Sequence, residues 1–121
     1  FGHPNWSKQN YNVNQLQNLN TIITTSYLVD YKNISVINFI KKYRVKFNFE
    51  PSEYSFKGFD IGFYFGKLLV KHGANYLDFI TKEKYKGLHN SFEFAFNPEF
   101  GYYNIDLMLV QYKNSTLNRI N

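Results

Sequence analysis

Three glycines spaced four residues apart, Gly58, Gly62 and Gly66, constrain the fold of this chain more than any other feature of its sequence. Residues at positions i and i+4 share one face of an α-helix, so the spacing predicts a helix with a bare stripe of backbone. Each glycine lowers helix stability by about 0.5–1 kcal/mol relative to alanine, unless another element packs close to the stripe. Because Phe59 and Phe63 lie beside the glycines, we expect this helix to dock tightly on a layer of parallel β-strands.

An amphipathic helix is predicted immediately upstream, from Ser35 to Phe47. Asn33 offers N-cap chemistry for this helix. Pro51 and Ser52 then break the pattern and restart it, and Gly73 fits the end of the glycine-bearing helix. The upstream helix has an apolar face of Val36, Phe39, Ile40, Tyr43 and Phe47 and a basic surface of Lys41, Lys42, Arg44 and Lys46.

Strand-forming segments flank the two helices. β-Branched residues before them and alternating aromatic residues after them are typical of buried and half-buried strands, respectively. The sequence therefore predicts an α/β fold: a strand, two to three helices, then a three-strand C-terminal segment, in a single unit over residues 1–121. The remaining predicted elements are a short helix over 75–81, with Leu77 and Ile80 directed inward, and strands over 21–29, 92–96, 104–112 and 116–120.

Composition limits the classes of function. The 13 Phe and 11 Tyr supply enough apolar surface for a packed core, and the lack of cysteine excludes disulfides, thiol nucleophiles and thiolate metal sites. No apolar run reaches the ~18 residues of a membrane span. The net charge of +5 invites a nucleic-acid hypothesis, but the cations are scattered, so we expect no nucleic-acid partner and keep an aromatic, basic nucleic-acid binder only as a third hypothesis.

No motif points to catalysis. Gly-x-Ser-x-Gly and phosphate-binding loops are absent from the sequence, and the three histidines are too far apart to form a local metal motif. Purely structural roles are expected for the following residues: His72 as a helix C-cap, His89 as a loop residue and Asp60 as a partner of the helix macrodipole. We therefore expect no enzyme, no catalytic residue, no metal and no cofactor.

In its order of elements, the chain resembles the C-terminal portion of a type I periplasmic-binding-protein fold. This is the family of leucine/isoleucine/valine-binding proteins and receptor-family ligand-binding proteins, and the resemblance is closest to envelope proteins of the Bacteroidetes type. The segments that carry it cover nearly the whole chain, and the most specific is the link from Pro51 to Asp60. The others are Phe1–Trp6, Thr25–Asp30, Phe39–Arg44 and Gly87-Leu88 with Phe92–Asn104.

The resemblance implies a bilobed architecture that holds ligand between two lobes. Residues 1 to about 24 would belong to one lobe, about 25 to 97 to the other, and the last hairpin to the first lobe again. Complete relatives are more than twice as long, so the resemblance makes the chain a C-terminal fragment of a larger ligand-binding domain. We expect complementation by the missing N-terminal half or by homo-oligomerisation, because unpaired strand edges are otherwise exposed.

The resemblance also implies ligand-binding residues. An aromatic residue before the glycine-bearing helix corresponds to Tyr54, and a polar loop after a second-lobe strand corresponds to His3 and Asn5, with Trp6 adjacent. The ligand class is a small polar molecule such as an amino acid. This loop lacks the family's acidic residue for a ligand ammonium. As alternatives to binding, Tyr54 anchors a hinge and Trp6 has a packing role only.

These observations lead to two main hypotheses. The first is a non-enzymatic ligand-binding module that resembles part of an extracytoplasmic solute-binding protein, of the ABC-transporter or sensor type, in the periplasm or cell envelope. The alternative is a structural or protein-interaction domain that self-associates through an exposed strand edge.

Overall fold

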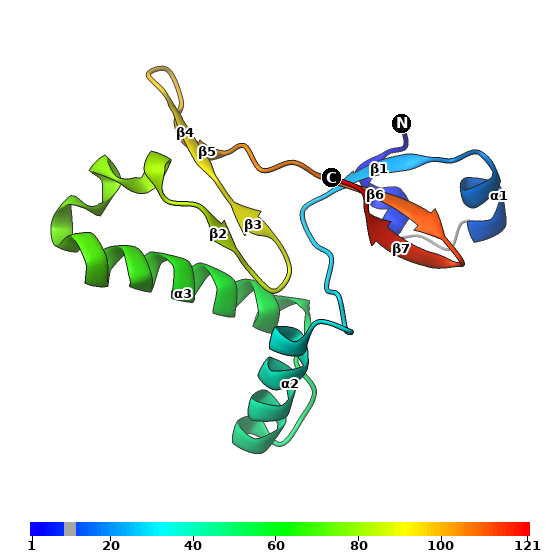
Figure 1. Cartoon of the computed structure of the whole chain (residues 1–121), viewed down its shortest axis with the longest axis horizontal. Helices are drawn as coiled ribbons and strands as arrows, with labels where there is room; N and C mark the ends of the chain where they lie inside the picture. The colour runs from blue at the N-terminus through cyan, green and yellow to red at the C-terminus, as the bar shows by residue number, and fades with distance from the viewer. Residues whose placement is uncertain (9–11) are drawn as a thin grey trace. The chain divides into compact units, whose positions relative to one another are not determined.

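The computed structural model describes residues 1–8 and 12–121 of a mixed α/β chain (Figure 1). The chain divides into two compact units. The sheet unit comprises residues 1–28 and 107–121, and the helical unit comprises residues 29–106. Within the described residues, no helix combines the length and the apolar character needed to cross a bilayer.

The sheet unit is built on three antiparallel strands in the order β1-β6-β7. A two-residue turn at Asn114 and Ser115 joins β6 to β7, and both residues have positive φ, as this tight hairpin turn requires. The buried side chains of Ile23, Met108 and Val110 form the core of the unit. The elements of the unit are η1 (Pro4–Ser7), α1 (Val13–Asn18), β1 (Ile22–Thr25), β6 (Met108–Lys113) and β7 (Thr116–Arg119).

The helical unit begins with α2 (Ile34–Phe47) and α3 (Glu53–His72), the two helices that the sequence predicts. The Asn33 side chain caps α2 by accepting a hydrogen bond from the Ser35 N–H at 2.8 Å. Ser52 starts α3 through a capping box, and Gly73 ends it with a φ of 62°. The ring of Phe39 on α2 lies 5.0 Å from that of Phe56 on α3, so aromatic contacts join the two helices.

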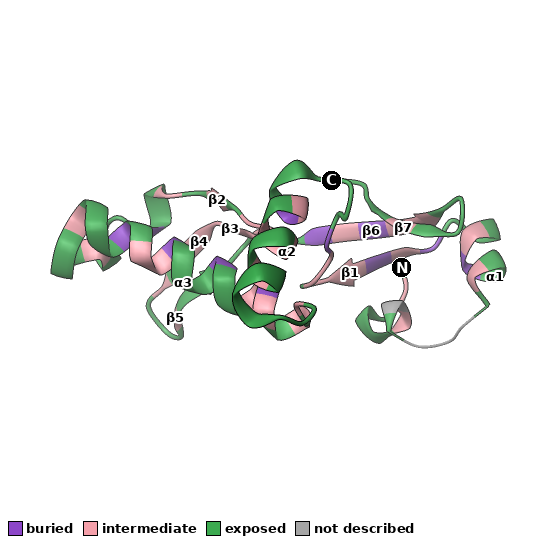
Figure 2. Cartoon of the chain, turned by 90° about the horizontal axis from the view of Figure 1, so that it is seen from below, coloured by how far each residue is buried: buried purple, intermediate pink, exposed green. Residues whose placement is uncertain are grey.

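The rest of the helical unit folds back along α3 as short 3-10 helices and two antiparallel strand pairs, β2-β3 and β4-β5. The buried stripe of α3 faces these pairs and is visible in Figure 2. Tyr64, Leu68 and Ile80 form its central cluster, with partly buried aromatic residues around them. The elements are η2 (Gly73–Asp78), η3 (Ile80–Lys82), β2 (Tyr85–Lys86), β3 (Ser91–Phe92), β4 (Phe94–Asn97) and β5 (Gly101–Asn104).

The prediction of a parallel sheet is wrong for the strands that the structure describes. All four strand pairings are antiparallel, and the parallel contact between Gly2 and Ile23 is an isolated bridge. Short connections explain the difference, because hairpins of a few residues can join only antiparallel neighbours. The predicted strand over 104–112 is divided between β5 and β6, and Leu77 is exposed whereas Ile80 is buried as predicted.

The prediction of close packing at the glycine stripe is also wrong. A Cβ atom placed on Gly58, Gly62 or Gly66 would have no neighbouring heavy atom within 4 Å. The helix carries a second stripe at the same spacing, and this stripe, which includes Phe56 and Tyr64, is the buried one. Burying the larger side chains removes more apolar area from water, so the aromatic stripe faces the core and the glycines face outward.

Candidate functional site

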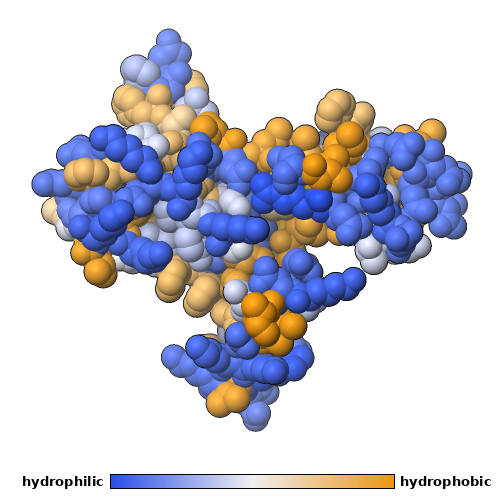
Figure 3. All heavy atoms as spheres, in the orientation of Figure 1, coloured by the Kyte–Doolittle hydropathy of each residue, from blue (hydrophilic) through white to orange (hydrophobic). Residues whose placement is uncertain are grey.

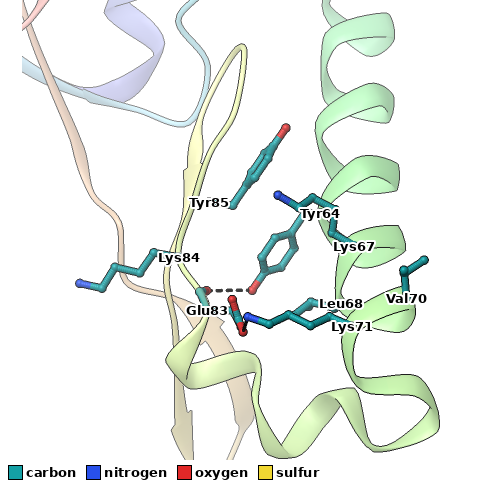
Figure 4. A pocket seen from close by; sticks show the side chains of 8 residues that line it. All are labelled: Tyr64, Lys67, Leu68, Val70, Lys71, Glu83, Lys84 and Tyr85. Atoms are coloured by element: carbon teal, nitrogen blue, oxygen red, sulfur yellow. Dashed lines mark hydrogen bonds and ion pairs between the residues drawn. The ribbon is translucent and has the colours of Figure 1, made fainter.

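A pocket lies in the helical unit between α3 and the chain that leads into β2 (Figure 4). Its volume is about 370 Å³. Small-molecule sites in proteins have volumes of roughly 300–1,000 Å³, so the pocket has room for a small ligand. Its walls are formed by Tyr64, Lys67, Leu68, Val70, Lys71, Glu83, Lys84 and Tyr85.

Three lysines and one glutamate give the pocket an excess of positive charge. The ammonium of Lys71 lies 2.6 Å from Glu83, and that of Lys84, which points away from the pocket in Figure 4, lies 2.7 Å from Glu93. Lys67 has no carboxylate partner among the residues that the structure describes, and its ammonium lies 5.6 Å from the centre of the Phe63 ring. Lys67 is therefore the cation that an anionic ligand would meet.

Glu83 is held by the side chains of Lys71 and His72 at the lower end of the pocket. The same carboxylate oxygen accepts a hydrogen bond from Lys71 at 2.6 Å and lies 3.0 Å from Nε2 of His72. These hydrogen bonds, that of Lys71 first, lower the pKa of Glu83. The carboxylate therefore stays ionised at neutral pH and binds its neighbours.

Two tyrosine rings form the apolar wall of the pocket. Their centroids are 5.7 Å apart, and the Tyr64 hydroxyl donates a hydrogen bond to the backbone carbonyl of Glu83 at 3.3 Å. Burial, followed by the charge of Glu83, raises the pKa of Tyr64. Burial, followed by the charge of Asp60 and a hydrogen bond to it, raises the pKa of Tyr85 to about 12. Both phenols therefore remain protonated at neutral pH.

A buried carboxylate on α3 fixes the β2–β3 turn and, with it, the Tyr85 wall. Oδ1 of Asp60 accepts hydrogen bonds from the Leu88 N–H at 2.8 Å and from the Tyr85 hydroxyl at 3.2 Å. Oδ2 accepts the His89 N–H at 2.9 Å and lies 2.5 Å from Nδ1 of the same histidine. Burial alone would raise the pKa of Asp60, but the hydrogen bonds from His89 and Leu88 outweigh it and lower the pKa.

Gly87 makes this close approach of the turn to α3 possible. A Cβ atom at this position would lie 2.5 Å from Oδ2 of Asp60 and 2.5 Å from the carbonyl oxygen of Asn90. Neither atom can move freely, because the first belongs to the buried carboxylate and the second to the backbone. The turn therefore requires a residue without a side chain.

Three of the predicted ligand-binding residues lie together at η1 in the sheet unit. His3 caps this 3-10 helix, with its Nδ1 atom accepting a hydrogen bond from the Asn5 N–H at 3.2 Å. Trp6 packs against the core formed by β1 and β6, close to Gly2. The structure thus brings these three residues together, and their contacts serve to cap η1 and to pack it against the sheet core.

The fourth predicted residue, Tyr54, lies in the first turn of α3 in the helical unit. Its side chain is 79% exposed, and its ring centre lies 5.8 Å from the Lys57 ammonium. Tyr54 does not line the pocket.

Sequence reasoning missed the pocket residues Lys67 and Tyr85. Lys67 lies on α3 and Tyr85 on β2, and the spacing of residues within either element does not predict that the two elements meet.

His89 lies in the β2–β3 loop as predicted, and His72 lies in the last turn of α3, directly before the Gly73 cap. Each also has a partner that the sequence did not indicate: His89 forms a buried pair with Asp60, and His72 binds Glu83 and stacks on Phe79 at 4.1 Å. The macrodipole assignment of Asp60 is wrong, because this residue lies beyond the first turn of α3. The signal that could have found the pair is a lone carboxylate on the apolar, aromatic stripe of α3.

Within residues 1–8 and 12–121, no group of three or more histidine or carboxylate side chains could hold a metal ion. No protein-family model, curated protein or solved structure matches the chain. The fold and the site thus define a mixed α/β protein with an open, cationic, tyrosine-walled pocket.

Proposed function

We propose that the chain is a non-enzymatic binding module whose pocket between α3 and β2 takes a small organic anion with a flat apolar body. The observation that carries this proposal is the pairing of Lys67, which has no carboxylate partner in the described part of the chain, with the ring walls of Tyr64 and Tyr85. An ammonium binds a carboxylate or phosphate, and aromatic rings pack against a planar group.

The protonation behaviour of the pocket favours binding over catalysis. General acid–base chemistry needs groups whose pKa lies near the working pH. Here the pKa of Tyr64 is raised, that of Tyr85 is about 12 and that of Glu83 is lowered, so all three titrate further from neutrality than usual. The phenols donate hydrogen bonds and the carboxylate orients Lys71.

The resemblance to type I periplasmic-binding proteins, and with it a periplasmic or envelope location and an amino-acid ligand, stays a prediction. The chain leaves the sheet unit at residue 28 and returns at residue 107, as the resemblance implies in outline. The antiparallel strand pairs and the outward-facing glycines differ from the parallel-sheet lobes of that family. The expected exchange between lobes was at about residues 24 and 97. The binding proposal does not depend on this resemblance, because the pocket lies within the helical unit.

The test compares two probes of similar size and opposite charge, phenylacetate and phenethylamine, in titrations of the isotope-labelled protein followed by NMR. We expect saturable shifts at the amides of Lys67 and Tyr85 with phenylacetate only. A charge-assisted hydrogen bond contributes about 1.5–3 kcal/mol. Lys67→Gln should therefore weaken phenylacetate binding roughly tenfold or more, since 1.4 kcal/mol corresponds to a factor of ten.

Lys46→Gln is the matched control. The Lys46 ammonium lies 5.6 Å from the centre of the Phe47 ring on α2, the same distance as that between the Lys67 ammonium and the Phe63 ring. Equal binding of the two probes, or equal loss of affinity in both variants, would contradict the proposal.

A further inference from the structure

Two lysines of α3 line the pocket on the same side of the helix. Lys67 and Lys71 are four residues apart, which places them roughly 6 Å apart along the axis at 1.5 Å per residue. Figure 4 shows both side chains reaching from α3 toward the β2 side of the pocket, with the Tyr64 ring between them. An anion that binds beside this ring therefore meets two ammonium groups.

The ion pair of Lys71 with Glu83 does not prevent the second contact. An ammonium carries three N–H donors, so Lys71 can bind a ligand oxygen while one donor stays on Glu83. The Lys71 side chain is 63% exposed, and Figure 3 shows hydrophilic side chains gathered over the C-terminal end of α3, where it lies. Ion pairs at such exposed positions contribute little to stability, so a change in the position of Lys71 costs little.

The two phenols of the pocket already donate hydrogen bonds elsewhere. The Tyr64 hydroxyl donates to the backbone carbonyl of Glu83, and the Tyr85 hydroxyl donates to Asp60. Among the side chains that line the pocket, the cationic ones are lysines and none is arginine. An arginine binds a planar carboxylate through two parallel N–H groups, whereas a lysine binds as a point charge and is a common phosphate ligand.

We infer that the pocket selects a dianion, the phosphate monoester of a flat ring compound, over singly charged anions. This inference rests on the proposed function, because it specifies the ligand of the same pocket. A phosphate monoester carries a charge of about −1.5 to −2 at neutral pH and three acceptor oxygens, so it can contact Lys67 and Lys71 together. Its ring would pack against Tyr64 and Tyr85.

NMR titrations of the isotope-labelled protein with phenyl phosphate, methyl phenyl phosphate and phenylacetate test the inference. The first two probes share a ring and a tetrahedral phosphate but differ in charge, provided that the pH is about 7.5, above the second phosphate pKa of about 6. We expect phenyl phosphate to bind roughly tenfold more tightly than either singly charged probe, because it gains a second charge-assisted contact. Added salt should narrow this difference.

Three variants assign the preference to one side chain. Lys71→Gln should weaken phenyl phosphate binding roughly tenfold and remove the preference for the dianion, whereas Lys71→Arg, which keeps the charge, should retain the preference. Lys84→Gln is the matched control, because Lys84 lines the pocket but points away from it in Figure 4 and lies 2.7 Å from Glu93. This control should leave the ratio of the affinities unchanged.

The outcomes separate this inference from the proposed function. Equal affinity for the doubly and singly charged probes, or equal effects of Lys71→Gln and Lys84→Gln, would overturn the inference. The proposed function would still stand in that case if phenylacetate binds saturably. If no anionic probe binds, both are wrong.

Discussion

Replacing Asp60 by asparagine should destabilise the helical unit because the buried carboxylate accepts hydrogen bonds at both oxygens. The NH₂ group of asparagine can only donate hydrogen bonds, and it takes the place of one of the two carboxylate oxygens. If the NH₂ group takes the position of Oδ2, it faces the His89 N–H. If it takes the position of Oδ1, it faces the Leu88 N–H. The His89 ring and the Tyr85 hydroxyl can adjust, but a backbone N–H cannot. At least one buried N–H therefore loses its acceptor in either orientation.

The expected cost follows from that loss. An unsatisfied buried donor costs about 1–3 kcal/mol, and hydrogen bonds to a charged group are stronger than neutral ones. We expect Asp60→Asn to lower the free energy of unfolding by roughly 2–4 kcal/mol at neutral pH, a large share of the ~5–15 kcal/mol typical of a whole domain.

The pH dependence gives the prediction a second, independent feature. Because the pKa of Asp60 is lowered in the folded state, its stabilising contribution is present above the pKa of the unfolded chain and is lost as the pH falls through the folded value. An unfolded aspartate titrates near 3.9. The difference in stability between the native chain and the Asn variant should therefore shrink below about pH 4.

Urea unfolding followed by far-ultraviolet circular dichroism reports chiefly on α2 and α3, whereas the fluorescence of Trp6, the single tryptophan, reports on the sheet unit. Asp78→Asn is the matched control, because Asp78 is exposed. A loss below about 0.5 kcal/mol for Asp60→Asn, the range of ordinary surface substitutions, would refute the reasoning. So would a difference that persists unchanged into acid.

Two further predictions concern the same turn and wall. Gly87→Ala should destabilise the helical unit by about 1–3 kcal/mol, the usual range for overpacking, because its Cβ would meet Asp60 and Asn90 at 2.5 Å. Thermal unfolding measures this loss of stability, and an unchanged midpoint temperature would contradict the close contact of the turn with α3. In an ultraviolet pH titration of the native chain, one phenol should ionise near pH 12, and this ionisation should be absent from the Tyr85→Phe variant. A Tyr85 hydroxyl that titrates near 10, the ordinary value for tyrosine, would contradict its burial beside Asp60.

The helices were predictable because their signals are local. Asn33, Ser52 and Gly73 sit at helix ends in the structure as their side chains and φ preferences require. The tight hairpin turn at Asn114 and Ser115 likewise falls in the break between the predicted strands over 104–112 and 116–120. Each of these features is decided within a few residues of the chain.

The candidate site was not predictable, because its contacts join distant positions. Asp60 and His89 are 29 residues apart, and only the folded chain shows that they meet. The glycine stripe was misleading for a different reason. It has the same period as the stripe through Phe56 and Tyr64, so spacing alone could not decide which of the two faces the core.

The position of the helical unit within the chain has a consequence for synthesis. Thr25 at the end of β1 pairs with Met108 of β6, and 83 positions separate them (108 minus 25). On a ribosome that adds about 5–20 residues per second, β1 emerges several seconds before its partner exists. During this interval the strand has no native neighbour on that edge, and a nascent chain that meets another copy at this stage can pair with the wrong β6.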